Sequence, residues 1–299
     1  MDEAMNSVYS RLSQALETKD YVSALEYCRQ GIAWGDDSLR QLYKWLANTI
    51  KDGNINHNIQ LFLAQNRNTL PPRENHFQME VIIPCYNQGR FLNDALRSVP
   101  QEIPVTVIND ASTDDTSKEI ASLAKLYPFS LYTNATNLNQ SGSINLAVSR
   151  SSSNLFVVLN ADDALVCYAI ATILDIYRSY EEVRMVGGNC TLFEESGQLP
   201  FGQVDFCRLG YVPKPKIFMP EDALHFNHPN DLNMTMSGCS FLKSAWQAAG
   251  GLWDFEKRVC SFDDRDFQMR VAALFPVAVL DESLAYYRTN SSVGRGRFT

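Results

Sequence analysis

Beginning at Met79, short apolar segments alternate with segments of helical pattern, and this alternation constrains the fold more than any other feature. The apolar segments are MEVIIP (79–84), PVTVIN (104–109), LFVVLN (155–160) and VRMVGG (183–188). Each precedes a polar or helical stretch, which is typical of a parallel sheet covered by helices. We therefore predict an α/β domain over residues 79–299, Rossmann-like, with a mostly parallel sheet flanked by helices.

The first 70 residues have a different texture and predict a small all-α domain. Apolar side chains recur there at helical spacing, as in Val22, Leu25 and Ile32. The segment YVSALEYCRQGIAWGD (21–36) resembles one helix-turn-helix unit of a tetratricopeptide-type repeat, but no second copy follows at a fixed period. A helical cap packed on the next domain is the favoured interpretation, with residues 71–78 as the linker.

The overall charge and the cysteines limit the setting in which such a chain works. A formal net charge of -8 argues against a nucleic-acid partner, which usually needs a basic face. The seven cysteines include no Cys-x-x-Cys pair, and no run of about 18 apolar residues occurs. These features predict a cytoplasmic protein, with peripheral attachment to the inner face of a membrane, or self-association, through residues 1–70 left open.

Polar residues follow several of the expected strands. The first strand runs into Pro84, Cys85, Tyr86 and Asn87; the second runs into Asn109 and Asp110; LFVVLN runs into Asn160, Ala161, Asp162 and Asp163. In open parallel sheets, ligands bind beyond the carboxyl ends of the strands. The sequence therefore predicts that these three clusters meet at one ligand-binding edge.

Asp162 and Asp163 favour a metal site. Two adjacent carboxylates after a buried strand repel each other unless a cation or hydrogen-bond donors lie beside them. Mg²⁺ or Mn²⁺ takes one or two protein carboxylates and completes its coordination with water and substrate phosphate oxygens. The alternative is a helix N-cap, in which one of the two acids caps a helix that begins near Ala164. The residues alone leave both interpretations open.

The second cluster is compatible with a nucleotide. Asp110 follows a strand, where a carboxylate can accept hydrogen bonds from a base ring or a ribose, and Tyr86 offers an aromatic face at the neighbouring strand end. The next acids, Asp114 and Asp115, are more simply explained as partners of a helix N-terminus.

A third acidic cluster lies in SFDDRDFQMRVAAL (261–274). Asp263 and Asp264 precede a helical pattern, and a carboxylate brought to the strand-end edge could take a proton from a hydroxyl as a general base. Arg270 lies four residues after Asp266, so we expect those two to pair along the helix.

Six motifs in order resemble one family. They are VIIPCYN, VINDASTDDT, NLNQSGSINLA, VVLNADD, GGLWD and FDDRDFQMR, and they span about 210 residues. Together they resemble the family 2 nucleotide-sugar glycosyltransferases, which have the glycosyltransferase A-type fold. The N-terminal helices are not covered by this resemblance.

The resemblance implies roles for individual residues. Tyr86 would stack on the nucleobase, most commonly uracil, Asp110 would hydrogen-bond it, and Asn160 would contact the ribose. Asp162, with Asp163 beside it, would bind Mn²⁺ or Mg²⁺, and Asp264 would be the base, with Asp263 at the first position of the family's Glu-Asp pair. The remaining candidates for donor binding are Pro84, Asn87, Asn145, Ala161 and, as a phosphate contact, Arg288.

Three departures from the family pattern keep a second function open. Asn109 and Asn160 replace acids, and Ile144 stands where many members carry arginine. The leading prediction is an inverting glycosyltransferase that moves a sugar from a nucleotide sugar, most simply a UDP-sugar, to a hydroxyl of a glycan, lipid-linked or protein acceptor. The alternatives are a catalytically silent nucleotide-sugar binder or scaffold, and a nucleotidyltransferase, which would normally need a basic glycine-rich loop that does not follow Pro84.

Overall fold

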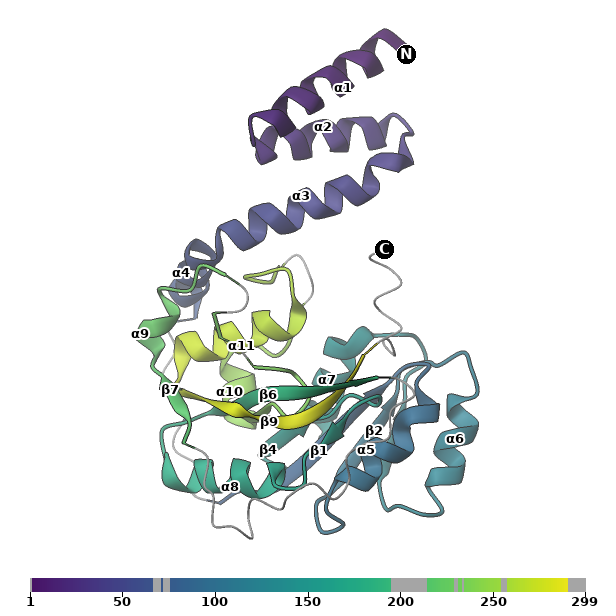
Figure 1. Ribbon diagram of the computed structural model, residues 1–299, viewed down its shortest axis with the longest axis vertical. Helices are drawn as coiled ribbons and strands as arrows, with labels where there is room; N and C mark the ends of the chain where they lie inside the picture. Colours follow the sequence, from purple (N-terminus) through teal and green to yellow (C-terminus); the bar gives the residue numbers. More distant parts are fainter. Residues whose placement is uncertain are drawn as a thin grey trace.

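The computed structural model describes residues 2–66, 71, 76–194, 214–228, 231–232, 234–253 and 257–289. The described residues form a sheet of nine strands with helices on both faces, preceded by a series of helices that extends away from it (Figure 1). The α/β class expected from the alternating pattern, with an all-α N-terminal region, is confirmed.

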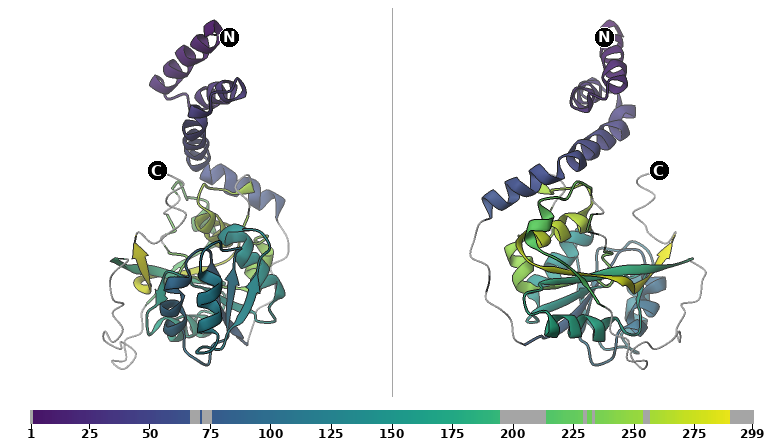
Figure 2. Two further views of the ribbon diagram at one scale, coloured as in Figure 1. Left: turned by 90° about the vertical axis from the view of Figure 1, so that its right-hand side faces the viewer. Right: turned by 60° about the vertical axis from the view of Figure 1, so that its left-hand side comes forward.

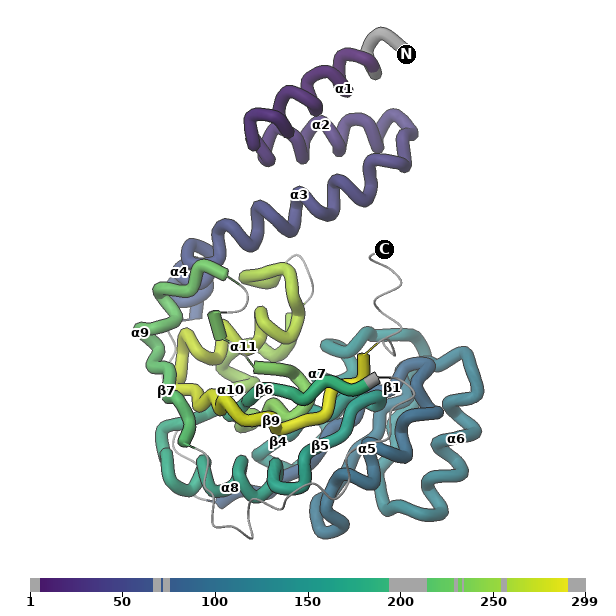
Figure 3. The backbone as a smooth tube through the Cα atoms, viewed as in Figure 1, coloured from purple at the N-terminus to yellow at the C-terminus, as the bar shows by residue number. Residues whose placement is uncertain are grey.

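The sheet is mostly parallel. Its strands are β1 (Met79–Cys85), β2 (Val105–Asn109), β3 (Ser130–Thr133), β4 (Leu155–Val158), β5 (Ala164–Leu165), β6 (Met185–Glu194), β7 (Lys216–Phe218), β8 (Ser240–Leu242) and β9 (Val277–Thr289). They lie in the order β3-β2-β1-β4-β8-β6-β9-β5, and β7 pairs with β9. Strand β8 is antiparallel to both β4 and β6, whereas β6 and β9 run parallel, side by side (Figure 3).

Both faces of this sheet are buried, which explains the continuous apolar strands. In β1, Val81 and Ile83 face one hydrophobic core and Ile82 faces the other, as the two-residue period of a strand requires. The first core holds α5 (Leu92–Ser98), α6 (Thr116–Leu123) and α8 (Ala169–Ser179). The second holds α7 (Asn139–Arg150), α10 (Lys243–Ala248) and α11 (Asp263–Leu274).

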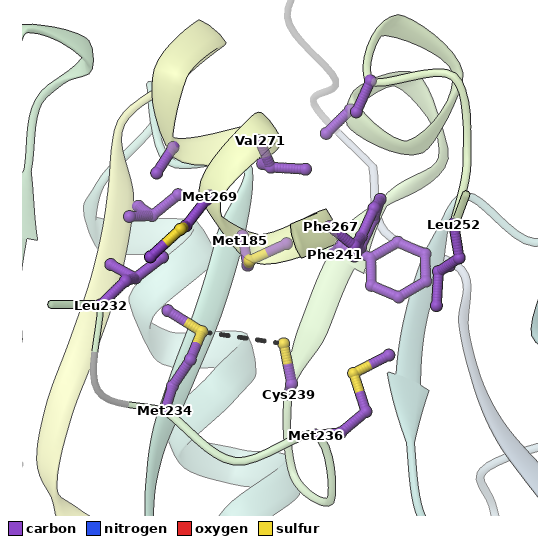
Figure 4. Packing of buried hydrophobic residues seen from close by; sticks show 14 of the residues in the cluster. Met185, Leu232, Met234, Met236, Cys239, Phe241, Leu252, Phe267, Met269 and Val271 are labelled. Carbon is purple, nitrogen blue, oxygen red and sulfur yellow. Dashed lines mark hydrogen bonds between the residues drawn. The ribbon is translucent and has the colours of Figure 1, made fainter. Parts of the chain in front are cut away.

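The second core is rich in sulfur-containing side chains. Figure 4 shows Met185, Met234, Met236 and Met269 around Cys239, with the Cys239 Sγ lying 3.9 Å from the Met234 Sδ. Methionine fills irregular gaps well, because its side chain is unbranched and flexible. Two short helical segments complete the α/β domain. They are η2 (Gly89–Phe91), which precedes α5, and α9 (Pro220–Ala223), which contacts α11.

The N-terminal helices divide between two packing units. They are α1 (Asp2–Glu17), α2 (Tyr21–Ala33), the turn η1 (Asp37–Leu39), α3 (Arg40–Gly53) and α4 (Ile55–Gln65). The first three helices share a small core of their own and project from the α/β domain (Figure 2). Helix α4 instead buries Ile55, Ile59 and Phe62 in the second core of the α/β domain.

This packing refines the expected helical cap over residues 1–70. Helix α4 packs on the α/β domain, whereas α1 to α3 share a core of their own, so the hydrophobic cores divide near Asn54. No helix in the described part of the chain is long and apolar enough to cross a membrane.

Candidate active site

A cavity of about 390 Å³ lies at the carboxyl ends of β1, β2 and β4. Its lining residues are Pro84, Cys85, Tyr86, Gln88, Asp110, Asn137, Asn139, Gln140, Asn160, Asp162, Thr235, Met236, Ser237, Asp264, Arg265 and Tyr287. The three strand-end clusters therefore meet at one edge, as expected, and the start of α11 joins them.

The loops after β1 and β2 are tied together by Asn87, which adopts a positive φ of 55°. Its Nδ2 donates to the Thr113 Oγ1 at 3.1 Å, and its Oδ1 accepts from the Thr113 backbone N–H at 2.8 Å. Asparagine tolerates this left-handed conformation better than most residues. Asn87 therefore shapes the wall beside Tyr86, although it does not itself line the cavity.

Asp110 is oriented by two donors from the segment before α7. The Asn134 Nδ2 donates to Asp110 Oδ1 at 2.7 Å, and the Leu138 backbone N–H donates to the same oxygen at 2.8 Å. The side chain is 3% exposed and faces the cavity. Because both bonds end on Oδ1, Oδ2 is the oxygen that is left to accept from a ligand.

The asparagines that replace family acids have structural partners. Asn109 Nδ2 donates to the Ser117 Oγ at 3.0 Å, and its Oδ1 accepts from the Ser112 backbone N–H at 3.1 Å. Asn160 accepts from the Gln140 Nε2 at 2.6 Å while still lining the cavity. Neutral amides here reduce the negative charge around the cavity and hold neighbouring segments together.

Asp162 and Asp163 are adjacent in sequence but face different surroundings. Asp162 lines the cavity. Asp163 is 1% exposed and accepts hydrogen bonds from the Ser237 Oγ, from the Arg288 backbone N–H at 2.9 Å and from the Asn160 Nδ2 at 3.4 Å. Burial, with the charge of Asp162 second, raises the pKa of Asp163 to about 7. These donors give Asp163 a structural role, and its part in metal binding stays a prediction.

The helix-cap alternative for these two acids is wrong. Asp163 is followed by β5, and the next helix, α8, begins only at Ala169, with no side-chain hydrogen bond at its N-cap Tyr168. In contrast, the expected role of Asp114 is confirmed, since its Oδ1 accepts from the Thr116 backbone N–H at 2.9 Å at the start of α6.

Arg288 is buried away from the cavity lining. Its Nε donates to the Asp162 carbonyl at 2.9 Å, one of its terminal nitrogens pairs with Asp94 at 2.7 Å, and its guanidinium stacks on Phe91 at 4.6 Å. These contacts fasten the end of β9 to the loop that carries Asp162. The structure therefore gives Arg288 a supporting position, and its contact with a phosphate stays a prediction.

Asn145 and Ala161 also lie apart from the cavity. Asn145 Oδ1 accepts from the Trp246 Nε1 and the Leu252 backbone N–H, both at 2.9 Å, and its Nδ2 donates to the Leu252 carbonyl at 2.8 Å. Ala161 is fully buried in the first core. Neither side chain lines the cavity, and a donor contact by either residue stays a prediction.

The two acids at the start of α11 also differ in their surroundings, as Asp162 and Asp163 do. Asp264 lines the cavity, whereas Asp263 accepts from the Ser141 Oγ at 3.1 Å and lies 3.9 Å from Arg258. Burial, followed by the charge of Asp263, raises the pKa of Asp264. A raised pKa makes this carboxylate a stronger proton acceptor than an exposed one.

The expected pair of Asp266 and Arg270 is confirmed and is fully buried. The two side chains approach to 2.7 Å, and the guanidinium stacks on Trp253 at 3.8 Å. Losing either partner would leave a buried charge uncompensated, which typically costs about 3 to 5 kcal/mol. This pair fixes α11 against the second core.

Sequence reasoning missed two cavity residues of interest. Arg265 lines the cavity, and its guanidinium donates to the Gln268 Oε1 at 2.9 Å and to the Leu232 carbonyl at 3.2 Å. Ser237 lies before β8, next to Gly238, whose φ of +83° and close approach to Leu284 suit only glycine. The arginine could have been found from its place directly after Asp264.

The charges around the cavity fit a metal that arrives with a diphosphate. Asp110, Asp162 and Asp264 line it, and Arg265 is the single basic side chain among the lining residues that the structure describes. A diphosphate would be repelled by three carboxylates unless a further cation accompanied it. Among the described residues, no group of three His, Cys, Asp or Glu side chains could hold a metal alone. The donor set therefore fits an ion held by Asp162 together with substrate oxygens.

Comparisons with known proteins agree with this architecture. Residues 80–189 match the sequence model of glycosyl transferase family 2. The structure of S. aureus TarS 1–349 in complex with UDP-GlcNAc is similar at 14% identity, with a TM-score of 0.54 over 71% of this chain and 59% of that chain. The mannosyltransferase PcManGT from Pyrobaculum calidifontis, in complex with GDP-Man and Mn²⁺, is similar at 15% identity, with a TM-score of 0.50 over 83% and 67%. No curated protein sequence matches the chain.

The fold of this protein is of the glycosyltransferase A type. The match to the model of glycosyl transferase family 2 over residues 80–189 covers four of the six motifs and agrees with the resemblance drawn from them. The match to TarS spans about three fifths of that structure, and at this level of identity the structural likeness establishes the fold.

Proposed function

We propose that this protein is an inverting, metal-dependent glycosyltransferase that uses a UDP-sugar as donor. The observation that carries the proposal is that Asp162 and Asp264, 102 positions apart in the sequence, line one cavity with Tyr86 and Asp110. This arrangement supplies the parts that transfer from a nucleotide sugar needs: a base contact, a ligand for the diphosphate's cation and a proton acceptor.

Donor binding would use the strand-end residues. Tyr86 stacks on the uracil ring, and the Oδ2 of Asp110 accepts its N–H, since Oδ1 is already occupied by Asn134 and Leu138. Asn160 contacts a ribose hydroxyl. Arg265 lies near the diphosphate and offsets part of its charge.

Mn²⁺ or Mg²⁺, held by Asp162 and the donor's phosphate oxygens, would stabilise the charge on the departing diphosphate. Asp264 takes the proton of the acceptor hydroxyl as its oxygen forms a bond to the anomeric carbon. The bond between that carbon and the diphosphate oxygen breaks, and UDP leaves. Attack opposite the leaving group inverts the anomeric configuration. Acceptors of this chemistry are hydroxyls of a glycan, a lipid-linked sugar or a protein.

Calorimetry with UDP tests the donor site. UDP should bind more tightly with Mn²⁺ than without it, and a panel of UDP-sugars should then reveal one that is slowly hydrolysed to UDP. Absence of UDP binding with and without Mn²⁺ would contradict the proposal. UDP binding without hydrolysis of any sugar would instead favour the silent nucleotide-sugar binder.

A further inference from the structure

The end of helix α3 reaches the loop that leads into the candidate base. Residues 258–262, which directly precede α11, are referred to as the 258–262 loop. Asp52, in the last turn of α3, accepts from the Ser261 backbone N–H at 2.8 Å through Oδ1 and from the Ser261 Oγ at 2.7 Å through Oδ2. These bonds join segments 209 positions apart. Ser261 lies three residues before Asp264.

A second bond from the N-terminal helices holds the same loop. Asn58, in the first turn of α4, donates from its Nδ2 to the Val259 carbonyl at 2.9 Å. Beside it, Phe62 packs edge-to-face on Trp253, with the ring centroids 5.5 Å apart. Helices α4 and α11 are in direct contact. The junction between α3 and α4 is therefore hydrogen-bonded to this loop on both sides of Asn54.

The loop is held from its other side by α11. The Val259 backbone N–H donates to Asp266 of α11, and the Arg258 Nε donates to the Trp253 carbonyl at 2.8 Å. No residue of the 258–262 loop belongs to a strand or helix, so its backbone groups need such partners. Asp52 and Asn58 satisfy the two loop residues that flank Cys260.

We propose that Asp52 is a positioning residue for Asp264: by fixing the backbone at Ser261, it sets where α11 begins and hence where the base meets the acceptor hydroxyl. This inference rests on the proposed function. A carboxylate that accepts two hydrogen bonds at one residue defines the loop more tightly than a neutral partner does. The residues proposed to contact the nucleoside, Tyr86, Asp110 and Asn160, lie on other segments, so their geometry does not depend on Asp52. Of the proposed donor contacts, Arg265 shares α11 with Asp264.

The consequence is that the N-terminal helices act chiefly on turnover and less on donor affinity. A mutation far from the chemistry that misplaces a reacting group by about 1 Å can lower a rate by about 100-fold. We therefore expect Asp52→Ala to lower kcat for UDP-sugar hydrolysis by roughly 10- to 100-fold and to change UDP affinity far less, through Arg265 alone.

The experiment uses the full chain, with Asp52→Ala, Asp52→Asn and the matched control Asp20→Ala. Asp20 caps α2, where its side chain accepts from the Ser23 backbone N–H, and it lies far from the loop. For each variant, UDP binding with Mn²⁺, kcat for UDP-sugar hydrolysis and hydrogen exchange in peptides covering residues 258–265 are measured.

The inference predicts faster exchange over 258–265 and a lower kcat in Asp52→Ala. Asp52→Asn should recover part of both, because its Oδ1 can still accept from the Ser261 N–H. Asp20→Ala should keep the wild-type kcat. Wild-type exchange and kcat in Asp52→Ala, or an equal loss in Asp20→Ala, would overturn the inference. If the wild type neither binds UDP nor hydrolyses a UDP-sugar, the proposed function fails, while exchange over 258–265 still decides whether Asp52 positions the loop.

Discussion

Two pairs of adjacent aspartates each contribute one residue to the cavity lining, and in each pair the two residues have different surroundings. Asp162 and Asp264 line the cavity. Asp163 is held by Ser237, Asn160 and the Arg288 backbone, and Asp263 is held by Ser141. Adjacent carboxylates at a turn or a helix start point in different directions, so one can act on a ligand while the other holds the loop.

The difference between the pairs is equally informative. Asp163 is nearly inaccessible and anchors the end of β9, whereas the side chain of Asp263 is 34% exposed. We therefore expect substitutions in the first pair to change donor binding and the free energy of unfolding. Substitutions in the second pair should change kcat and its dependence on pH. Four substitutions separate these contributions.

Asp264→Asn should have the largest effect. An amide cannot take the acceptor's proton, so kcat for transfer or donor hydrolysis should fall by about 10³-fold, within the range of general base catalysis. UDP affinity measured by calorimetry should stay at the wild-type value. A variant that keeps wild-type kcat would remove Asp264 from the mechanism.

Asp162→Asn should weaken donor binding. The amide lacks the charge that a divalent cation needs, so Mn²⁺-dependent UDP binding should weaken by roughly 100-fold, or about 2.8 kcal/mol. Binding of UDP without Mn²⁺ serves as the internal control and should change little. Equal weakening with and without the metal would indicate that Asp162 supports the pocket without binding the ion.

Asp163→Asn should change how stability depends on pH. The folded-state pKa of Asp163 is about 7, above the usual unfolded value of about 3.9. Between these values the folded chain binds a proton that the unfolded chain has released, so the free energy of unfolding falls as pH rises from about 4 to about 7. Removing this titration should reduce that fall by at least about 1 kcal/mol.

The measurement for Asp163→Asn is urea unfolding at several pH values in metal-free buffer. Asp264→Asn, measured in parallel, reports how much of the slope comes from the other cavity carboxyl. An unchanged pH slope in Asp163→Asn would show that Asp163 is ionised in the fold throughout this range.

Asp263→Asn should have the smallest effect, visible in the pH profile. The charge of Asp263 contributes to raising the pKa of Asp264, after burial. A neutral amide in its place should move the acid limb of the kcat profile to lower pH, while the plateau stays near wild type, because the Ser141 bond can be kept. A shift to higher pH, or a collapse of the plateau like that in Asp264→Asn, would contradict the division of roles.

Much of the fold could be predicted from local patterns. The strands β1, β2 and β4 and the start of β6 coincide with apolar segments, because a parallel strand buried on both faces is largely apolar. Strand β3 is polar and exposed at the sheet edge, so it has no apolar segment that would predict it. Strands β5 and β7 have only two and three residues, which is too short for a recognisable pattern. The division of the N-terminal helices depends on long-range packing of Phe62 and its neighbours, which periodicity cannot show.

Much of the candidate site was predictable because its residues follow parallel strands. Asp110, Asn160 and Asp162 line the cavity for this reason, and Asp264 comes from the acidic cluster in residues 261–274. Ser237 was missed because β8 is antiparallel, so the residues before it, and not after it, reach the cavity edge. A motif fixes a residue's place in the chain but not the direction of its side chain, so the sequence could not show that Asn145 and Arg288 make internal hydrogen bonds.

A crystal structure of the full chain with UDP and Mn²⁺ would test the central claim most directly, since the anomalous signal locates the ion. We predict that the ion contacts the Asp162 carboxylate and the UDP phosphates, that Asp163 keeps its bond to the Arg288 backbone, and that Asp264 faces the space beyond the diphosphate. An ion bound by Asp163, or by Asp263 and Asp264 together, would contradict the account.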